Sequence, residues 1–187
     1  KSIINFKYIK KDQNYFEVLN KIKVILSDKM KIKKLDKNKK IIVSYLKKNL
    51  IENKKTNRPK FQLTPNITKE ISLLDEKDIL RYLLHRYRYD IYPLIHHMDN
   101  YPPYLQIEPT SFCNFRCVFC FQSNRDFSKK SSGYMGHMKL ETFKLIIDQA
   151  EGNIEFISLA SRGEPLLCPD INEMLSYTRD KFLNLKI

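Results

Sequence analysis

The stretch Tyr104-Leu-Gln-Ile-Glu-Pro-Thr-Ser-Phe-Cys113-Asn-Phe-Arg-Cys117-Val-Phe-Cys120 decides the fold. It holds three of the four cysteines of the chain, in the order C-x3-C-x2-C. One loop can turn three such thiolates toward a single point, as a polynuclear iron cluster requires. Iron–sulfur clusters are normally held by four Cys ligands, but the fourth cysteine, Cys168, lies far downstream. The spacing therefore predicts a cluster with one iron left open.

The sequence around this loop alternates between strand and helix patterns. We predict strands at residues 105–108, 154–160 and 183–187, and helices at residues 139–151 and 170–181. Alternation of units of this length predicts a parallel α/β sheet. The strand 154–160 is largely apolar, which is typical of a strand buried on both faces. The ends of the first two strands carry the cysteine loop and Arg162-Gly-Glu-Pro165, at the edge where such sheets bind ligands.

C-x3-C-x2-C with an aromatic residue before the last Cys resembles the signature of the radical S-adenosylmethionine (radical SAM) superfamily. Phe156-Ile-Ser-Leu-Ala-Ser-Arg-Gly-Glu-Pro165 is similar to the Gly-Gly-Glu-Pro motif of that family, with Arg162 in place of the first Gly. Gly133-Tyr-Met-Gly-His-Met138 resembles the linker of members that modify peptides, the SPASM-type branch. The similarity covers residues 101–187 and does not extend to the first hundred.

The resemblance implies the fold, the cofactors and the site. The fold would be the first strand–helix units of an incomplete parallel (βα) partial barrel. The implied ligands of a [4Fe–4S] cluster are Cys113, Cys117 and Cys120. Phe119 would offer its ring to the adenine of SAM, while Gly163 and Glu164 would contact SAM, the carboxylate meeting the ammonium group. No catalytic side chain is predicted.

The implied reaction is reductive cleavage of SAM to a 5′-deoxyadenosyl radical, which abstracts hydrogen from an unidentified substrate. The cofactor carries this chemistry, while the protein binds and orients it. The linker favours a peptide or protein as substrate, and a flavodoxin or ferredoxin is the implied electron donor.

Other interpretations of the same residues remain open. A zinc site could use Cys168 or His137 as fourth ligand, although zinc ligands usually come in two pairs. Disulfides are not expected in a chain with so few cysteines. Phe119 could belong to the core, and Glu164 could be a solvated loop charge.

The whole net charge of +13 falls on residues 1–100, whereas basic and acidic residues balance in residues 101–187. This asymmetry predicts a boundary near residue 100, between a basic, mainly helical region and the core described above. Because Lys far outnumbers Arg, the preferred residue for planar phosphate recognition, we expect a solvated face rather than a nucleic-acid interface. A cluster- or metal-stabilised nucleic-acid-binding module is the alternative, and a catalytically inactive remnant is another.

Helical spacing in the basic region predicts helices at residues 14–27, 41–52 and 76–90, the last with Asp75 as N-cap. Residues 28–40 are predicted as a linker or frayed helix, and residues 53–68 as a loop. Basic and aromatic residues interleave on the third helix, for example Arg81, Tyr82 and His85. We interpret them as an amphipathic helix whose Tyr rings straddle core and solvent, with single-stranded nucleic acid as the alternative.

The 187 residues suffice for one or two domains. No apolar run approaches the roughly 18 residues of a membrane span, and clustered free thiols indicate a reducing compartment, hence the cytoplasm. The sequence starts with Lys and ends in a strand pattern. We therefore expect a fragment, the N-terminal part of a longer enzyme, that is inactive on its own.

Overall fold

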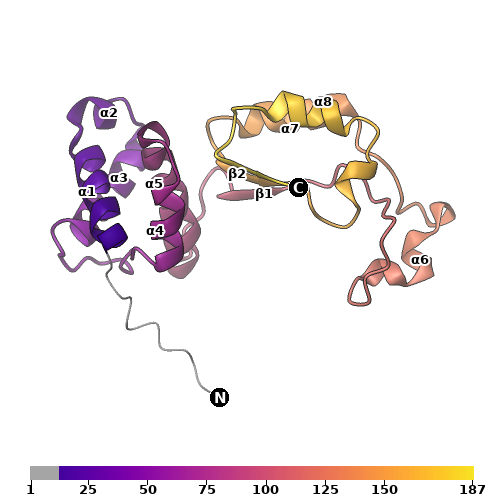
Figure 1. Ribbon diagram of the computed structural model, residues 1–187, viewed down its shortest axis with the longest axis horizontal. Helices are drawn as coiled ribbons and strands as arrows, with labels where there is room; N and C mark the ends of the chain where they lie inside the picture. The colour runs from indigo at the N-terminus through magenta and orange to yellow at the C-terminus, as the bar shows by residue number, and fades with distance from the viewer. Residues whose placement is uncertain (1–12) are drawn as a thin grey trace, which may run out of the picture. The chain divides into compact units, whose positions relative to one another are not determined.

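A computed structural model describes residues 13–187 of the chain. The chain divides into two compact units, Lys1–Met98 and Asp99–Ile187, and Figure 1 shows the helices of the first and the sheet of the second. Each unit buries apolar side chains of its own. Among the described residues, no helix is long and apolar enough to cross a membrane.

The first unit is built of helices. Their bounds are α1 Gln13–Ser27, α2 Lys29–Lys33, α3 Lys37–Leu50, α4 Pro65–Ser72 and α5 Glu76–Ile91, followed by the 3-10 turn η1 Pro93–Ile95. The helices predicted at residues 14–27, 41–52 and 76–90 are confirmed as α1, α3 and α5, although α3 begins earlier than expected. Apolar residues at helical spacing are thus sufficient to locate the longer helices.

One prediction for this unit was wrong and another was confirmed only in part, because capping side chains are a weaker signal in the sequence than apolar periodicity. The loop predicted at 53–68 ends early, since α4 begins at Pro65 and the Thr64 side chain accepts a hydrogen bond from the Ile67 amide. Proline is tolerated there because the first helical N–H has no partner in any case. Asp75 occupies the N-cap position of α5 as predicted, but its side chain makes no capping bond. Its carboxylate instead lies 3.8 Å from the Lys77 ammonium.

Helix α5 is more deeply buried than an amphipathic surface helix. It contacts both α1 and α3, and Tyr82 and His85, expected at or near the solvent boundary, are each only 2% exposed. The Tyr82 hydroxyl donates to Glu70, and burial followed by this bond raises the pKa of Tyr82. These two aromatic rings are core residues, which removes them from any nucleic-acid surface.

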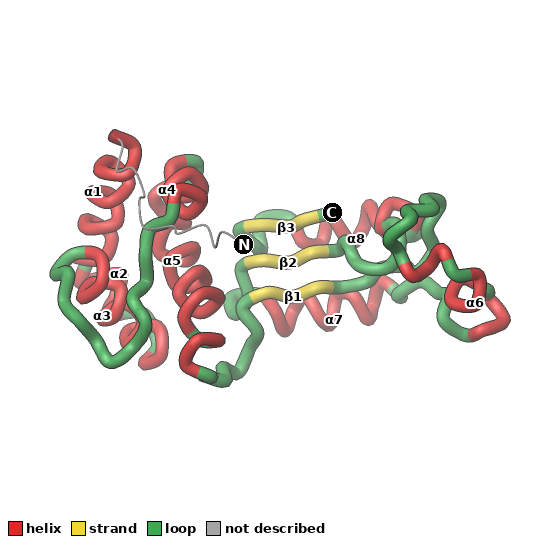
Figure 2. The backbone as a smooth tube through the Cα atoms, turned by 90° about the horizontal axis from the view of Figure 1, so that it is seen from below, coloured by secondary structure: helices red, strands yellow, loops and turns green. Residues whose placement is uncertain are grey.

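The second unit contains a small parallel sheet. Its strands are β1 Tyr104–Gln106, β2 Phe156–Ser158 and β3 Asn184–Lys186, in the order β1-β2-β3. Leu105 pairs with Ile157, and Ile157 pairs with Leu185. Helices α7 Leu140–Ala150 and α8 Ile171–Thr178 connect successive strands and cover the same face of the sheet (Figures 1 and 2). The predicted α/β alternation is therefore confirmed as an open three-stranded parallel sheet.

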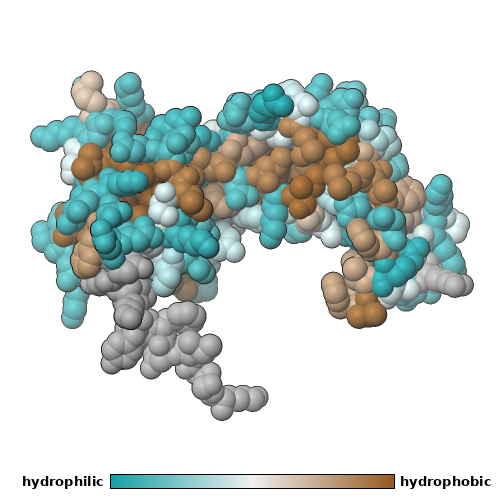
Figure 3. Space-filling model, viewed as in Figure 1, coloured by the Kyte–Doolittle hydropathy of each residue, from teal (hydrophilic) through white to brown (hydrophobic). Residues whose placement is uncertain are grey.

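The core of the second unit lies between this sheet and its two helices. Ile157, Phe143 and Ile147 are at most 1% exposed, and burial of each such side chain contributes about 1.5–3 kcal/mol. Figure 3 shows hydrophobic side chains gathered at the level of the sheet, below the hydrophilic outer surface of α7 and α8. The second strand, predicted to be buried on both faces, has the successive residues Ile157 and Ser158 only 1% and 2% exposed, although the helices cover one face of the sheet (Figures 1 and 2).

Candidate cofactor site at the carboxyl edge of the sheet

The parallel pairing of β1 and β2 brings two distant segments to one edge of the sheet. The segment that leaves β1 leads into the cysteine loop, and the segment that leaves β2 contains Arg162-Gly-Glu-Pro165. The Ile107 amide donates to the Ser158 carbonyl at 2.8 Å, which carries the pairing beyond the end of β1. Carboxyl ends of parallel strands are the usual ligand edge of such sheets.

Gly163 allows these two segments to touch. A Cβ atom at this position would lie 1.9 Å from the Thr110 carbonyl oxygen and 2.8 Å from the Phe112 carbonyl oxygen. The next residue, Glu164, donates its amide to the same Phe112 carbonyl at 2.8 Å. The base of the cysteine loop is therefore packed backbone to backbone against the Arg162–Pro165 segment, at a position where only glycine fits.

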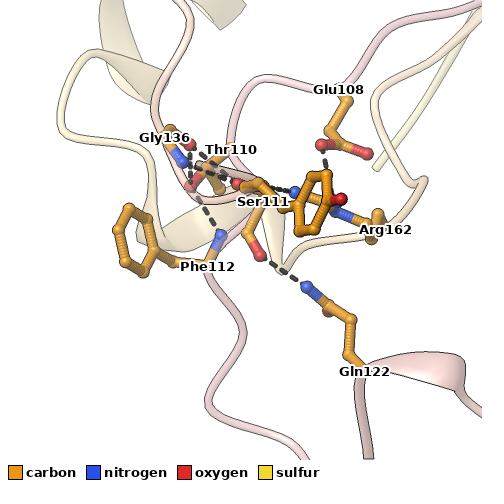
Figure 4. Close-up of polar contacts among 8 residues, drawn as sticks. Glu108, Thr110, Ser111, Phe112, Gln122, Gly136 and Arg162 are labelled. Atoms are coloured by element: carbon orange, nitrogen blue, oxygen red, sulfur yellow. Dashed lines mark hydrogen bonds and ion pairs between the residues drawn. The ribbon is translucent and has the colours of Figure 1, made fainter. Parts of the chain in front are cut away.

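A second attachment joins the cysteine loop to the linker, residues 133–138. Ser111, which is buried, donates its amide to the Gly136 carbonyl at 3.0 Å, and its hydroxyl accepts from the Gly136 amide at 2.7 Å. The Met138 amide donates to Pro109 at 2.8 Å. Figure 4 shows the contacts between Ser111 and Gly136. The linker thus lies against the base of the loop rather than away from it.

The loop that carries the thiols is open to solvent at its tip. Cys117 is exposed, Cys113 and Cys120 are half-buried, and all three are free thiols. The two ends of the loop are closed by Gln122, which is 6% exposed and donates its amide group to the Ser111 carbonyl at 2.7 Å. Among the described residues, no group of three or more Cys, His, Asp or Glu side chains is placed to hold a metal ion. The three thiols therefore lie on one loop but are not close enough together here to form a metal-binding group.

The other two candidate ligands are engaged elsewhere. Cys168 is 2% exposed within the core of the second unit, and burial raises the pKa of its thiol. The ring of His137 packs against that of Phe112, with centroids 4.7 Å apart. Burial of Cys168 argues against the zinc interpretation that uses it. The donor set that remains, three free thiols on one exposed loop, fits a [4Fe–4S] cluster that has three protein ligands.

Phe119 and Glu164, two of the predicted cofactor contacts, differ in how far they are exposed to solvent. Phe119 is 89% exposed, so the alternative that it belongs to the core was wrong. Glu164 is half-buried, and its carboxylate accepts from the Leu166 amide at 3.2 Å, at the start of the 3-10 turn η4 Pro165–Leu167. Contacts of Phe119, Gly163 and Glu164 with SAM stay predictions, as does ligation by the three loop cysteines.

The residues that support the loop could not be found from the sequence. Ser111 and Gly136 are 25 positions apart, and Gln122 and Glu108 belong to no pattern of their own. Arg162 was visible only as a departure from the glycine motif. In the structure its Nε lies 3.5 Å from Glu108 Oε1, and its terminal nitrogen donates to the Tyr134 carbonyl.

The fold and the site at the carboxyl edge of the sheet define a class of protein. It is an α/β unit with a thiol-rich loop at the edge of a parallel sheet where ligands usually bind. A sequence profile described as the radical SAM superfamily matches residues 107–186. An S-adenosylmethionine-dependent nucleotide dehydratase from Flammeovirga pacifica is 41% identical over 64 residues, which cover 34% of this chain and 21% of that protein. No solved structure matches the chain.

Residues 107–186 are therefore similar in sequence to the radical SAM superfamily, whose members use a [4Fe–4S] cluster and SAM. The matched segment begins directly after β1 and ends in β3, so it includes every site residue discussed above. The chain spans about a fifth of the length of the curated relative that it matches.

Proposed function

We propose that this chain is the cluster- and SAM-binding part of a radical SAM enzyme. The observation that carries the proposal is the packing of the cysteine loop against Gly163 and Glu164, two residues of the second family motif, at the carboxyl edge of a parallel sheet. We also propose that the three strands are the first strands of a partial (βα) barrel, with the helix-free face of the sheet turned toward the barrel interior.

Cys113, Cys117 and Cys120 would hold the cluster, and the core position of Cys168 keeps it from becoming a fourth ligand. The chemistry that a bound, reduced cluster and SAM would supply there is reductive cleavage of SAM to a 5′-deoxyadenosyl radical, which would abstract hydrogen from the substrate. The chain's own contribution is to bind and orient. Gly163 holds the two motif segments together, Glu164 offers a carboxylate to the SAM ammonium, and the exposed ring of Phe119 is available to cover the adenine.

Two substrate classes compete. The linker Gly133–Met138 resembles that of peptide-modifying enzymes of the SPASM type, which favours a peptide or protein. The relative from Flammeovirga pacifica is named for action on a nucleotide, which favours a nucleotide. Incubation of the reduced enzyme with SAM and each class would separate them, because the true substrate raises the rate of 5′-deoxyadenosine formation and the other does not.

The remaining partners follow from the chemistry. The reaction needs a reductant, and we propose a flavodoxin or ferredoxin acting in the cytoplasm. Nucleic acid is not among the proposed partners, because two of the aromatic residues that could have stacked on bases, Tyr82 and His85, are buried in the core of the first unit.

Iron analysis of two cysteine variants tests the proposal. Cys117→Ala should lose the cluster after anaerobic reconstitution, because two thiolates on the loop are too few to hold it. Cys168→Ala is the matched control, and it should keep the iron and sulfide content of the unmodified protein. Full iron in Cys117→Ala, or stoichiometric zinc in the unmodified protein, would contradict the assignment.

A further inference from the structure

We propose that Arg162 is a positioning residue, whose guanidinium fastens the Gly133–Met138 linker to the ends of β1 and β2. The family motif has glycine at this position, and glycine offers no side chain for this contact. The proposal concerns the linker and goes beyond the proposed function, because it requires neither the cluster nor SAM.

The contacts of Arg162 join three separate segments. Arg162 follows β2, and its Nε lies 3.5 Å from Glu108 Oε1, just beyond the end of β1, a distance that makes an ion pair rather than a hydrogen bond. Its terminal nitrogen donates to the main-chain carbonyl of Tyr134, 28 positions earlier in the linker. The side chain is 19% exposed and that of Glu108 is 34% exposed, so water screens the pair only in part. Figure 4 shows the ion pair between Arg162 and Glu108.

The two halves of the linker are attached by different means. At its C-terminal half, Gly136 bonds to Ser111, and the Met138 amide bonds to Pro109. At its N-terminal half, the bond from Arg162 reaches the Tyr134 carbonyl. The second attachment therefore depends on the Arg162 side chain, whereas the first includes two backbone–backbone bonds, from the Ser111 and Met138 amides. A single substitution can remove the second without touching the first.

The position of the linker shapes the space beside the cysteine loop. A depression of about 610 Å³ is lined by Arg162, Glu108, Tyr134, Met135 and Lys139, among others, and also by Ser111, two residues before Cys113. The Arg162 guanidinium and the linker form part of its wall. Release of Tyr134 would thus change the shape of a cavity next to the candidate cluster site. Arginine suits this task because its planar fork can engage a carboxylate and a carbonyl together, whereas a Lys ammonium is a single point charge.

Amide hydrogen exchange of residues 133–138 in the full-length protein tests the proposal. In Arg162→Ala we expect exchange at the Gly136 amide, which donates to the Ser111 hydroxyl, to rise on the order of tenfold, because the neighbouring attachment of the linker at Tyr134 is lost. Arg162→Lys should restore part of the protection. The matched control is Arg179→Ala, which removes an exposed arginine at the end of α8 and should leave the linker unchanged.

Unchanged exchange in the linker of Arg162→Ala would overturn the proposal. So would a uniform rise over α7, α8 and the linker, since that pattern reports loss of stability throughout the unit. If Arg162→Ala does not fold, Glu108→Gln breaks only the ion pair, and it should still raise exchange at the Gly136 amide by a smaller factor. Iron content is recorded in parallel. A variant with full iron and a loosened linker supports the role of Arg162, whereas a protein that never binds iron refutes the proposed function and leaves the exchange test intact.

Discussion

Substitution of Gly163 by alanine tests the packing that holds the candidate site together. The added Cβ would lie 1.9 Å from the Thr110 carbonyl oxygen and 2.7 Å from its carbonyl carbon. These are backbone atoms of a residue that is 1% exposed, so they cannot swing aside as a flexible side chain would. Overpacking of this kind costs about 1–3 kcal/mol, and separation of the segments would also break the Glu164–Phe112 hydrogen bond, worth about 1 kcal/mol. We expect Gly163→Ala to lose about 3 kcal/mol of unfolding free energy.

Gly136→Ala is the matched control for this experiment. It makes the same chemical change in the neighbouring linker, but there the added Cβ would meet no atom of the described residues within 4 Å. Its stability should stay within about 1 kcal/mol of the unmodified protein, since Gly→Ala at a compatible site alters mainly the entropy of the unfolded chain. Denaturant unfolding of both variants, followed by circular dichroism, measures the difference. Equal stability of the two variants would refute the close approach at Gly163.

Three further predictions follow from buried groups. The Cys168→Ala variant should keep the iron content of the unmodified protein. Its free energy of unfolding should fall by about 1 kcal/mol, because the substitution removes a small group from the core. Loss of iron in this variant would show instead that Cys168 is a ligand. In the iron-free protein at pH 8, alkylation followed by mass spectrometry should modify Cys168 last, because the thiol is buried and its pKa is raised, and equal labelling of all four cysteines would contradict this burial. The pKa of Tyr82 is raised from 10.0, so the stability that it contributes is present below pH 10 and is lost as the pH rises further. Tyr82→Phe should lower the free energy of unfolding by about 1 kcal/mol at pH 7. It should also reduce the loss of stability above pH 10, measured by unfolding at a series of pH values. An identical pH dependence of stability in both proteins would refute this prediction.

Much of the fold could be predicted from the sequence because periodicity reports burial directly. The apolar spacing of α1, α5 and α7 and the apolar run around Ile157 located these elements to within a few residues. Helix α4 was missed because Pro65 reads as a breaker in the sequence, although proline is well suited to the first turn of a helix. Tyr82 and His85 were placed too near the solvent, since the number of neighbours that surround α5 is a tertiary property.

The candidate site could be predicted only in part. Its thiols and the Gly163-Glu164 pair lie within short motifs, so their presence was visible. The supports of the site are contacts between distant segments, such as Gly136 with Ser111 and Arg162 with Tyr134. No local pattern encodes such pairs, and the parallel register that brings them together arises only when the sheet forms.

Anaerobic reconstitution of the full-length protein tests the central claim most directly. After iron and sulfide are counted, the EPR spectrum of the reduced cluster is recorded with and without SAM, and 5′-deoxyadenosine is assayed. The account predicts a [4Fe–4S] cluster whose spectrum changes when SAM is added, together with formation of 5′-deoxyadenosine. Stoichiometric zinc, or a cluster whose spectrum is indifferent to SAM, would contradict it.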